Sequence, residues 1–324
     1  MDAVPVIDIS RFDEERAEKV LDAAINVGFL WIDGHGLSKD NVRSAFNLSR
    51  QFFTLDREEK SKYPIQNNQG FAALNVEELD PSTPSDYKES FNFGADDLMN
   101  GTQNQPLPPV FTEQHDFLSS FATSCHSICL DILKFFGHAL KVPGGPYFLA
   151  ASHQPGASSG STLRLLHYPA VEEEVQGDNR AGAHSDYGSI TLLFQQPGSS
   201  GLEIMLPGKG WVPVPALPAN DTNSAPPILV NIGDQLSYWT AGLLRSTIHR
   251  VRMPNRGQER YSMVYFCHPN DDALLEPVPS EIVRERKGRG ANAAEGEVLT
   301  AGEHLRRRLA ATYGWKENED GQKQ

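Results

Sequence analysis

The chain has 324 residues and a formal net charge of −13 at pH 7, from 29 Lys and Arg against 42 Asp and Glu. Nucleic acids and anionic membranes attract basic surfaces, so this charge argues against either as a partner. The sequence shows no apolar stretch long enough to cross a bilayer and no secretion signal at its start. At this length we expect one large domain or two small ones with a sizeable core.

Cysteine usage indicates the compartment. The cysteines Cys125, Cys129 and Cys267 are few and odd in number. Oxidising compartments favour paired cysteines, whereas cytosolic thiols stay reduced. We therefore expect free thiols and a cytoplasmic protein.

Residues 1–110 are predicted to form an N-terminal region of helices and strands. Residues 4–9 alternate as in a strand, and residues 17–25 carry apolar side chains at helical spacing. Residues 63–104 are rich in Pro, Asn, Asp, Ser and Gly, and a segment of this length is typical of a lid over a site. Within it, Phe91 and Phe93 lie in a predicted strand. We expect them either to wall a substrate cavity or to pack in the core.

Residues 111–160 contain the clearest helical pattern of the chain, followed by a connection. Apolar side chains line one face between Gln114 and Leu140, which predicts a long helix packed behind the core. Cys125, His126 and Cys129 resemble a metal-binding group. Both cysteines lie on the apolar face, however, where a free cysteine behaves as a small hydrophobic residue.

Residues 161–270 change to short apolar runs separated by Gly and Pro turns. Many short strands at near-regular spacing predict a β-sandwich or jelly roll. Residues 271–324 are predicted as a C-terminal helical segment that carries three consecutive arginines. The predicted strands are 162–168, 190–194, 202–205, 211–214, 228–232, 246–251 and 261–267.

His184 and Asp186 form the strongest candidate site. They precede the predicted strand 190–194, and residues two apart in an extended chain point to the same side. A second histidine, His249, lies in a later predicted strand. Two histidines and one carboxylate form the facial triad that holds non-haem Fe(II) and leaves coordination positions open. A zinc hydrolase uses a similar ligand set.

Arg260 and Ser262 share one face of the next predicted strand. A guanidinium beside a hydroxyl suits a carboxylate, which accepts two parallel hydrogen bonds. Val264 and Phe266 continue this face, so we expect it to be buried. The pair is predicted to bind the far carboxylate of a dicarboxylic acid that chelates the metal at its other end. Zinc hydrolysis would leave both residues without a role.

Seven sequence motifs are spread over nearly the whole chain, from residue 4 to residue 313. Near the start are VPVIDIS, GFLWIDGHGL and FFTLDREEK. Further on are HYP at 167–169, HSDYGSITLL, NIGDQLSYWTAGLLRSTIHRV and RYSMVYF. In this order and spacing they resemble the Fe(II)/2-oxoglutarate-dependent dioxygenases of the isopenicillin N synthase-like group.

The resemblance implies a fold and a set of iron ligands. The fold class is mainly β with flanking helices, with a double-stranded β-helix (jelly roll) core at 161–270 that contains the iron and 2-oxoglutarate sites. His184, Asp186 and His249 match the iron ligands of the family.

The resemblance also implies a co-substrate site. Arg260 and Ser262 match the residues that bind the distal carboxylate of 2-oxoglutarate, and Tyr168 matches a tyrosine that hydrogen-bonds it. One position departs from the family pattern. Many plant members have asparagine two residues before this tyrosine, where this chain has Leu166.

The implied function is a dioxygenase that uses Fe(II), 2-oxoglutarate and O2 to hydroxylate, desaturate or cyclise a small organic molecule in specialised metabolism. Arg164 is expected either to meet an acidic group of the substrate or to be a solvated edge residue. Two other functions remain open. One is an iron oxidase of the same fold that does not use 2-oxoglutarate, and the other is a non-catalytic metal- or ligand-binding sensor. The sequence leaves the oligomeric state undetermined.

Overall fold

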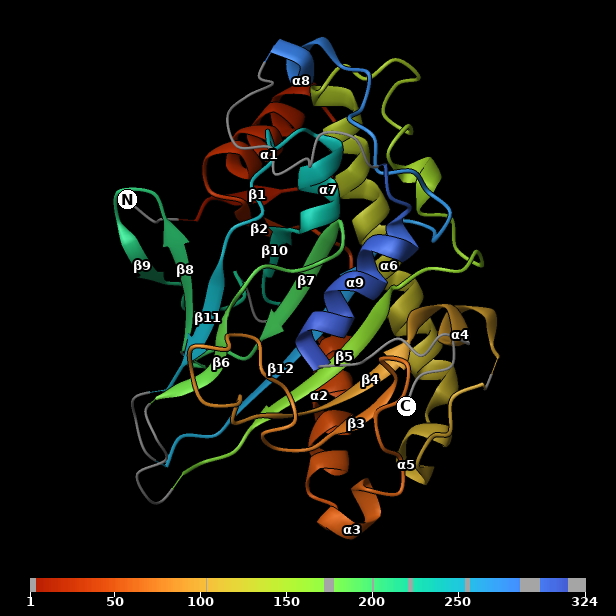
Figure 1. The fold of residues 1–324 in the computed structure, drawn as a ribbon, viewed down its shortest axis with the longest axis vertical. Coiled ribbons are helices and arrows are strands. Elements are labelled where there is room, and N and C mark those ends of the chain that lie inside the picture. The colour runs from red at the N-terminus through yellow and green to blue at the C-terminus, as the bar shows by residue number, and fades with distance from the viewer. Residues whose placement is uncertain are drawn as a thin grey trace.

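Two β-sheets form the centre of the computed structural model, which describes residues 4–102, 104–171, 178–199, 201–220, 224–253, 257–285 and 298–313. The larger sheet has eight strands in the order β1-β2-β10-β7-β12-β5-β4-β3, and the smaller has four in the order β6-β11-β8-β9. Neighbouring strands are antiparallel except β1 and β2. Together the two sheets make the predicted double-stranded β-helix core, with helices outside it (Figure 1).

From β5 to β12 the chain passes repeatedly between the two sheets, and only β8 and β9 follow one another in the same sheet. Their bounds are β1 Val6–Asp8, β2 Phe29–Asp33, β3 Gly70–Ala72, β4 Glu89–Gly94, β5 Thr162–Tyr168, β6 Asn179–His184, β7 Ile190–Gln195, β8 Leu202–Leu206, β9 Gly210–Pro213, β10 Ile228–Ile232, β11 His249–Arg252 and β12 Arg260–Cys267.

Most helices lie at the ends and along the outer side of the larger sheet, whereas α9 lies across the core strands (Figure 1). The long helix α6 contacts α1 and the strands β7 and β12, as predicted for a helix behind the core. None of the described helices is both long and apolar enough to span a membrane. The helices are α1 Glu14–Asn26, α2 Lys39–Phe53, α3 Arg57–Lys60, α4 Ala95–Asn100, α5 Pro109–Thr112, α6 His115–Ala139, α7 Asp234–Trp239, α8 Glu281–Glu285 and α9 Ala301–Tyr313, with a 3-10 turn at Ala150–Ser152.

Local sequence explains where the first helices begin and end. Asp13 and Ser38 precede α1 and α2, and each side chain accepts a hydrogen bond from a backbone N–H of the first turn. Gly28 follows α1 with a positive φ of 75°, a conformation that favours glycine. A Cβ at this position would overlap the carbonyl oxygen of Arg245, so the close approach of these two segments also requires glycine.

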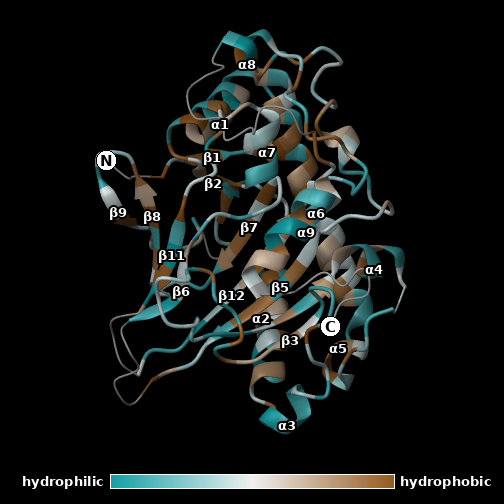
Figure 2. Cartoon of the chain, in the orientation of Figure 1, coloured by the Kyte–Doolittle hydropathy of each residue, from teal (hydrophilic) through white to brown (hydrophobic). Residues whose placement is uncertain are grey.

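Apolar side chains form one large core and two smaller clusters, of which one lies close to the residues described below. The larger core lies between the helices and the outer face of the eight-stranded sheet, and a smaller cluster joins Leu166, Tyr168 and Val264 of the larger sheet to Ala181 and Val251 of the smaller sheet. Figure 2 shows hydrophobic residues along the central strands, whereas the peripheral helix α3 is mostly hydrophilic. The smaller cluster holds the two sheets together close to the residues described below.

Phe91 and Phe93 belong to the larger core. Both are fully buried on β4, and their rings contact the ring of Phe111, while Phe91 also contacts Phe52. The segment predicted as a lid therefore contributes a core strand to the larger sheet. Of the two roles expected for Phe91 and Phe93, the structure therefore supports packing in the core and not lining a substrate cavity.

We expect Phe91→Ala to lower the free energy of unfolding by about 3–5 kcal/mol, because it removes a fully buried aromatic ring from a packed cluster. Urea denaturation measures this change. Tyr147→Ala serves as the control, since Tyr147 is 63% exposed and its loss should change stability by only about 0.5 kcal/mol. Equal stabilities for the two variants would contradict the assignment of Phe91 to the core.

Candidate active site

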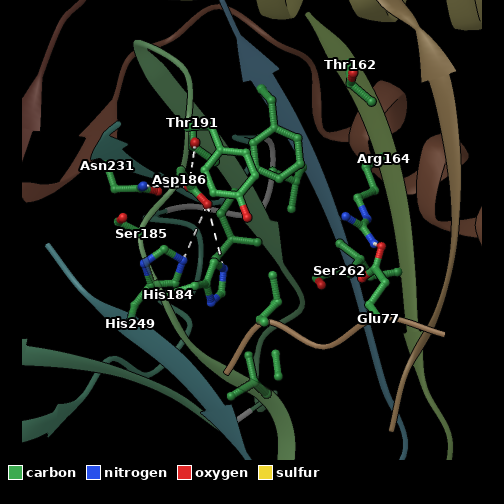
Figure 3. A pocket seen from close by; sticks show the side chains of 18 of the residues that line it. Glu77, Thr162, Arg164, His184, Ser185, Asp186, Thr191, Asn231, His249 and Ser262 are labelled. Atoms are coloured by element: carbon green, nitrogen blue, oxygen red, sulfur yellow. Dashed lines mark hydrogen bonds and ion pairs between the residues drawn. The ribbon is translucent and has the colours of Figure 1, made fainter. Parts of the chain in front are cut away.

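His184, Asp186 and His249 meet at one point (Figure 3). His184 ends β6, Asp186 lies in the loop before β7, and His249 begins β11 directly opposite His184 in the sheet register. From Oδ1 of Asp186, Nε2 of His184 is 3.8 Å away and Nε2 of His249 is 3.7 Å away. Among the described residues this is the one group of at least three His, Cys, Asp or Glu side chains whose ligand atoms lie close enough to share a metal ion.

Backbone carbonyls fix the orientation of both imidazoles. Nδ1–H of His184 donates to the carbonyl of Gly182 at 2.7 Å, and Nδ1–H of His249 donates to the carbonyl of Thr247 at 3.2 Å. In the neutral ring this leaves the lone pair on Nε2, the atom that faces Asp186 in each case. Such hydrogen bonds are how proteins orient histidine ligands towards a metal.

Asp186 is oriented in the same way. Its Oδ2 accepts hydrogen bonds from the Thr191 hydroxyl at 2.6 Å and from the Asn231 amide at 2.7 Å, which leaves Oδ1 directed at the histidines (Figure 3). Thr191 and Asn231 are paired neighbours on β7 and β10. Both lie in the quoted motifs, but sequence reasoning did not assign them a role because that role depends on the pairing of two distant strands.

Burial and neighbouring side chains shift the pKa values of His184 and Asp186. Burial lowers the pKa of His184, and the neighbouring His249 lowers it further, so His184 is neutral near pH 7. Burial alone would raise the pKa of Asp186. The adjacent His249 and His184 and the hydrogen bonds from Asn231 and Thr191 nevertheless hold it below its usual value. His184 is therefore a neutral imidazole and Asp186 a carboxylate, and two histidines with one carboxylate are the donor set of a non-haem iron site.

Arg260 and Ser262 face the same pocket from β12, and Tyr168 faces it from the paired position on β5. Arg260 is 2% exposed, donates to Ser262 at 3.1 Å and to Gln195 at 3.0 Å, and lies over the ring of Tyr168. Burial lowers the pKa of Arg260, an effect that Tyr168 opposes.

The surroundings of Arg260 suit a carboxylate. Its Nε–H is buried and has no hydrogen-bond partner among the described residues. A buried donor of this kind costs free energy unless a ligand satisfies it. Leu166, opposite Ser262 on β5, adds an apolar side chain to the same wall, where many plant members of the group have a polar one.

Arg164 also lines the pocket, on the wall opposite the three proposed ligands (Figure 3). Its guanidinium pairs with Glu77 and donates to Ser90 at 2.8 Å. Lys88 contacts the other carboxylate oxygen of Glu77 at 3.1 Å and also pairs with Asp86. Arg164 is thus part of a buried network of two bases and two acids, and is not a solvated edge residue.

The pocket opens to solvent, and the empty space within it and at its mouth amounts to about 1070 Å³. Its apolar wall comes from both sheets and from helix α9, which contributes Leu305 and Leu309. The His–Asp–His group, the Arg260–Ser262 pair and the Arg164 network all line this one pocket.

Comparison with known proteins also indicates a non-haem iron oxygenase. The family model described as the 2OG-Fe(II) oxygenase superfamily matches residues 159–269, and the model described as non-haem dioxygenase in morphine synthesis N-terminal matches residues 4–112. The chain belongs to the 2OG-Fe(II) oxygenase superfamily. The predicted family, core fold and enzyme class are therefore confirmed, and the protein is an oxygenase that uses Fe(II), 2-oxoglutarate and O2 on a small molecule.

Three relatives illustrate the likeness of this oxygenase to known proteins. A Schizosaccharomyces pombe relative named UPF0676 protein C1494.01 is 36% identical over 96% of this chain and 93% of its own length. The proline hydroxylase buaE of Petromyces alliaceus is 33% identical over 90% of this chain and 91% of its own. A Neurospora crassa protein, solved in complex with alpha-KG (2-oxoglutarate) and 5-formyluracil, is 29% identical with a TM-score of 0.77 over 95% of this chain and 96% of its own.

We expect Asp186→Ala to abolish tight Co(II) binding while the thermal unfolding temperature of the apoprotein stays within a few degrees of wild type. Removing the carboxylate leaves two imidazoles, too few for the facial set. Visible absorption during anaerobic titration with Co(II) measures the binding. Glu203→Ala is the control, because Glu203 pairs with Arg250 away from the group. Unchanged Co(II) affinity in Asp186→Ala would contradict the assigned site.

Proposed function

We propose that His184, Asp186 and His249 hold Fe(II) in this oxygenase, and that Arg260, Ser262 and Tyr168 bind the distal carboxylate of 2-oxoglutarate. The observation that carries the proposal is that the His–Asp–His group and the buried guanidinium of Arg260 line one pocket. A dicarboxylic acid that reaches from one to the other is the ligand that this arrangement suits.

The residues of the chain act by position and not by acid–base chemistry. Bound Fe(II) and 2-oxoglutarate, with O2, supply an oxidative decarboxylation that releases succinate and CO2 and oxidises the substrate. His184, His249 and Asp186 keep their donor atoms aligned through the hydrogen bonds described above. Apolar side chains of both sheets and of α9 line the pocket beside these groups.

The Arg164 network indicates the kind of substrate. Because Glu77 already pairs with Arg164, an acidic substrate group would have to displace it. We therefore propose that Arg164 and Glu77 together contact a polar, uncharged part of a small substrate, as a donor and an acceptor side by side. This changes the expectation of an acidic substrate group.

Relatives define a first set of compounds to test. The Neurospora crassa protein has also been solved with thymine, and relatives include a proline hydroxylase and a homoarginine-6-hydroxylase. The named fungal relatives favour a role in specialised metabolism. The three cysteines are free and buried, which favours a reducing compartment such as the cytoplasm.

We expect one succinate to form for each substrate molecule oxidised when the protein is incubated with Fe(II), 2-oxoglutarate and thymine, L-proline or L-homoarginine in turn. Coupled detection of succinate and mass spectrometry of the product measure the two quantities. Product without succinate would support an oxidase that does not use 2-oxoglutarate. Oxygen consumption that never depends on Arg260 or on any added compound would support a sensor.

We expect Arg260→Ala to raise the 2-oxoglutarate concentration needed for half-maximal turnover by about 30-fold or more, the equivalent of at least about 2 kcal/mol for a lost buried charge pair. Succinate release at increasing 2-oxoglutarate measures it. The control is Arg250→Ala, since Arg250 pairs with Glu203 and lies over Trp211 outside the pocket. An unchanged requirement would remove Arg260 from the co-substrate site.

A further inference from the structure

Helix α9 contacts the loop of Asp186 on both sides of this proposed ligand. Before it, Ser185 donates to Asp234 at 3.1 Å, and Arg308 of α9 pairs with the same carboxylate oxygen at 3.3 Å. After it, the hydroxyl of Tyr187 hydrogen-bonds the hydroxyl of Thr312. The two contact points on the helix are one turn apart, and Asp186 lies between the two contact points on the loop.

Three further contacts connect these groups. The Arg308 guanidinium lies over the ring of Tyr187, 4.6 Å from its centroid, so this side chain contacts the residue after Asp186 as well as Asp234. The backbone N–H of Asp234 donates to the carbonyl of Asp186 at 2.8 Å. Asp234 is itself held by Ser246, which donates to its other oxygen at 2.6 Å. Asp234, which pairs with Arg308 of α9, is thus hydrogen-bonded to the backbone of Asp186, the proposed ligand.

The same helix closes the pocket. Leu305, Leu309 and Thr312 line the cavity that contains the His–Asp–His group, and Figure 1 shows α9 lying across the core strands at the front of the molecule. Any movement of α9 away from the pocket would break its contacts to Ser185, Asp234 and Tyr187. Pocket closure and the position of Asp186 are therefore mechanically linked.

We propose that Arg308 and Thr312 are positioning residues for Asp186, so that closure of the pocket by α9 sets the geometry of the proposed metal site. The inference rests on the proposed function, because it takes Asp186 to be a ligand. It assigns a role to one of the three consecutive arginines at 306–308.

The size of the effect follows from the exposure of the contacts. The Arg308 side chain is 42% exposed, and an ion pair in such a position stabilises a fold only weakly. Arg308 and Thr312 therefore act on the placement of the loop and not on global stability. Side chains that hydrogen-bond a metal ligand directly change metal affinity by about 10- to 100-fold when removed. Because these residues are one step further away, we expect about 3- to 10-fold.

Anaerobic titration of the full-length apoprotein with Co(II), followed by visible absorption, tests the proposal. Arg308→Gln and Thr312→Val should each weaken Co(II) binding by about 3- to 10-fold, and Thr312→Ser, which keeps the hydroxyl, should restore wild-type affinity. Arg306→Gln is the matched control, because Arg306 lies on the same helix and its side chain is exposed. Wild-type affinity in both Arg308→Gln and Thr312→Val would overturn the proposal.

If α9 affects metal binding, metal binding must affect α9 equally, because coupling between two sites is reciprocal. Hydrogen exchange in the wild-type protein therefore gives a second measurement. Bound Co(II) should slow hydrogen exchange at the amides of α9 in wild type by the same factor of about 3 to 10, and should slow it less in Arg308→Gln. Exchange in α9 that is independent of Co(II) would refute the link even if a variant proved unstable. If wild type and His249→Ala bind Co(II) with the same affinity, the proposed metal site is wrong. If His249→Ala loses Co(II) binding but the α9 variants do not, the metal site stands and only the role of α9 is refuted.

Discussion

The site depends on four hydrogen bonds to the side-chain atoms that do not face the proposed metal. Carbonyls of Gly182 and Thr247 take the Nδ1–H of the two histidines, and Thr191 and Asn231 occupy one oxygen of Asp186. Each bond turns the remaining donor atom towards the same point. Without them, two buried imidazoles and a carboxylate would have several other orientations, and a facial ligand set would form only part of the time.

The two sheets provide these partners from different directions. Thr191 and Asn231 come from neighbouring strands of the larger sheet, whereas His184 and His249 face each other across two strands of the smaller one. Arg260, which is proposed to bind the co-substrate, comes from β12, also in the larger sheet. A jelly roll thus brings these strands and the loop of Asp186 to one pocket, while its hydrogen-bonded sheets keep their separations fixed.

Sequence reasoning predicted most of this arrangement, because its signals are local. The alternation of β5 and β12, the spacing of His184 and Asp186, and the apolar face of α6 are each visible within a few residues. It did not predict β6, since Asn179–His184 has no apolar run. Nor did it predict the short helix α7, which begins at Asp234.

The placements that sequence reasoning could not decide depend on contacts between distant segments. Phe91 and Phe93 alternate with polar residues, which fits a cavity wall as well as a core, and only the packing against α2 and α5 separates the two. The pairing of Arg164 with Glu77 joins segments 87 residues apart. Tyr187 and Thr312, which join α9 to the loop of Asp186, are 125 residues apart, so the arginine run alone gave no indication of this contact.

The most direct test of the central claim is anaerobic addition of Fe(II) and then 2-oxoglutarate to the apoprotein, with the visible metal-to-ligand charge-transfer absorption as the signal. The account predicts an absorption that saturates at one Fe(II) and one 2-oxoglutarate per chain. It also predicts that His249→Ala abolishes the absorption and that succinate in place of 2-oxoglutarate, lacking the keto group, does not produce it. The same absorption in His249→Ala, or none in wild type, would contradict the proposal that these residues bring the two together in one pocket.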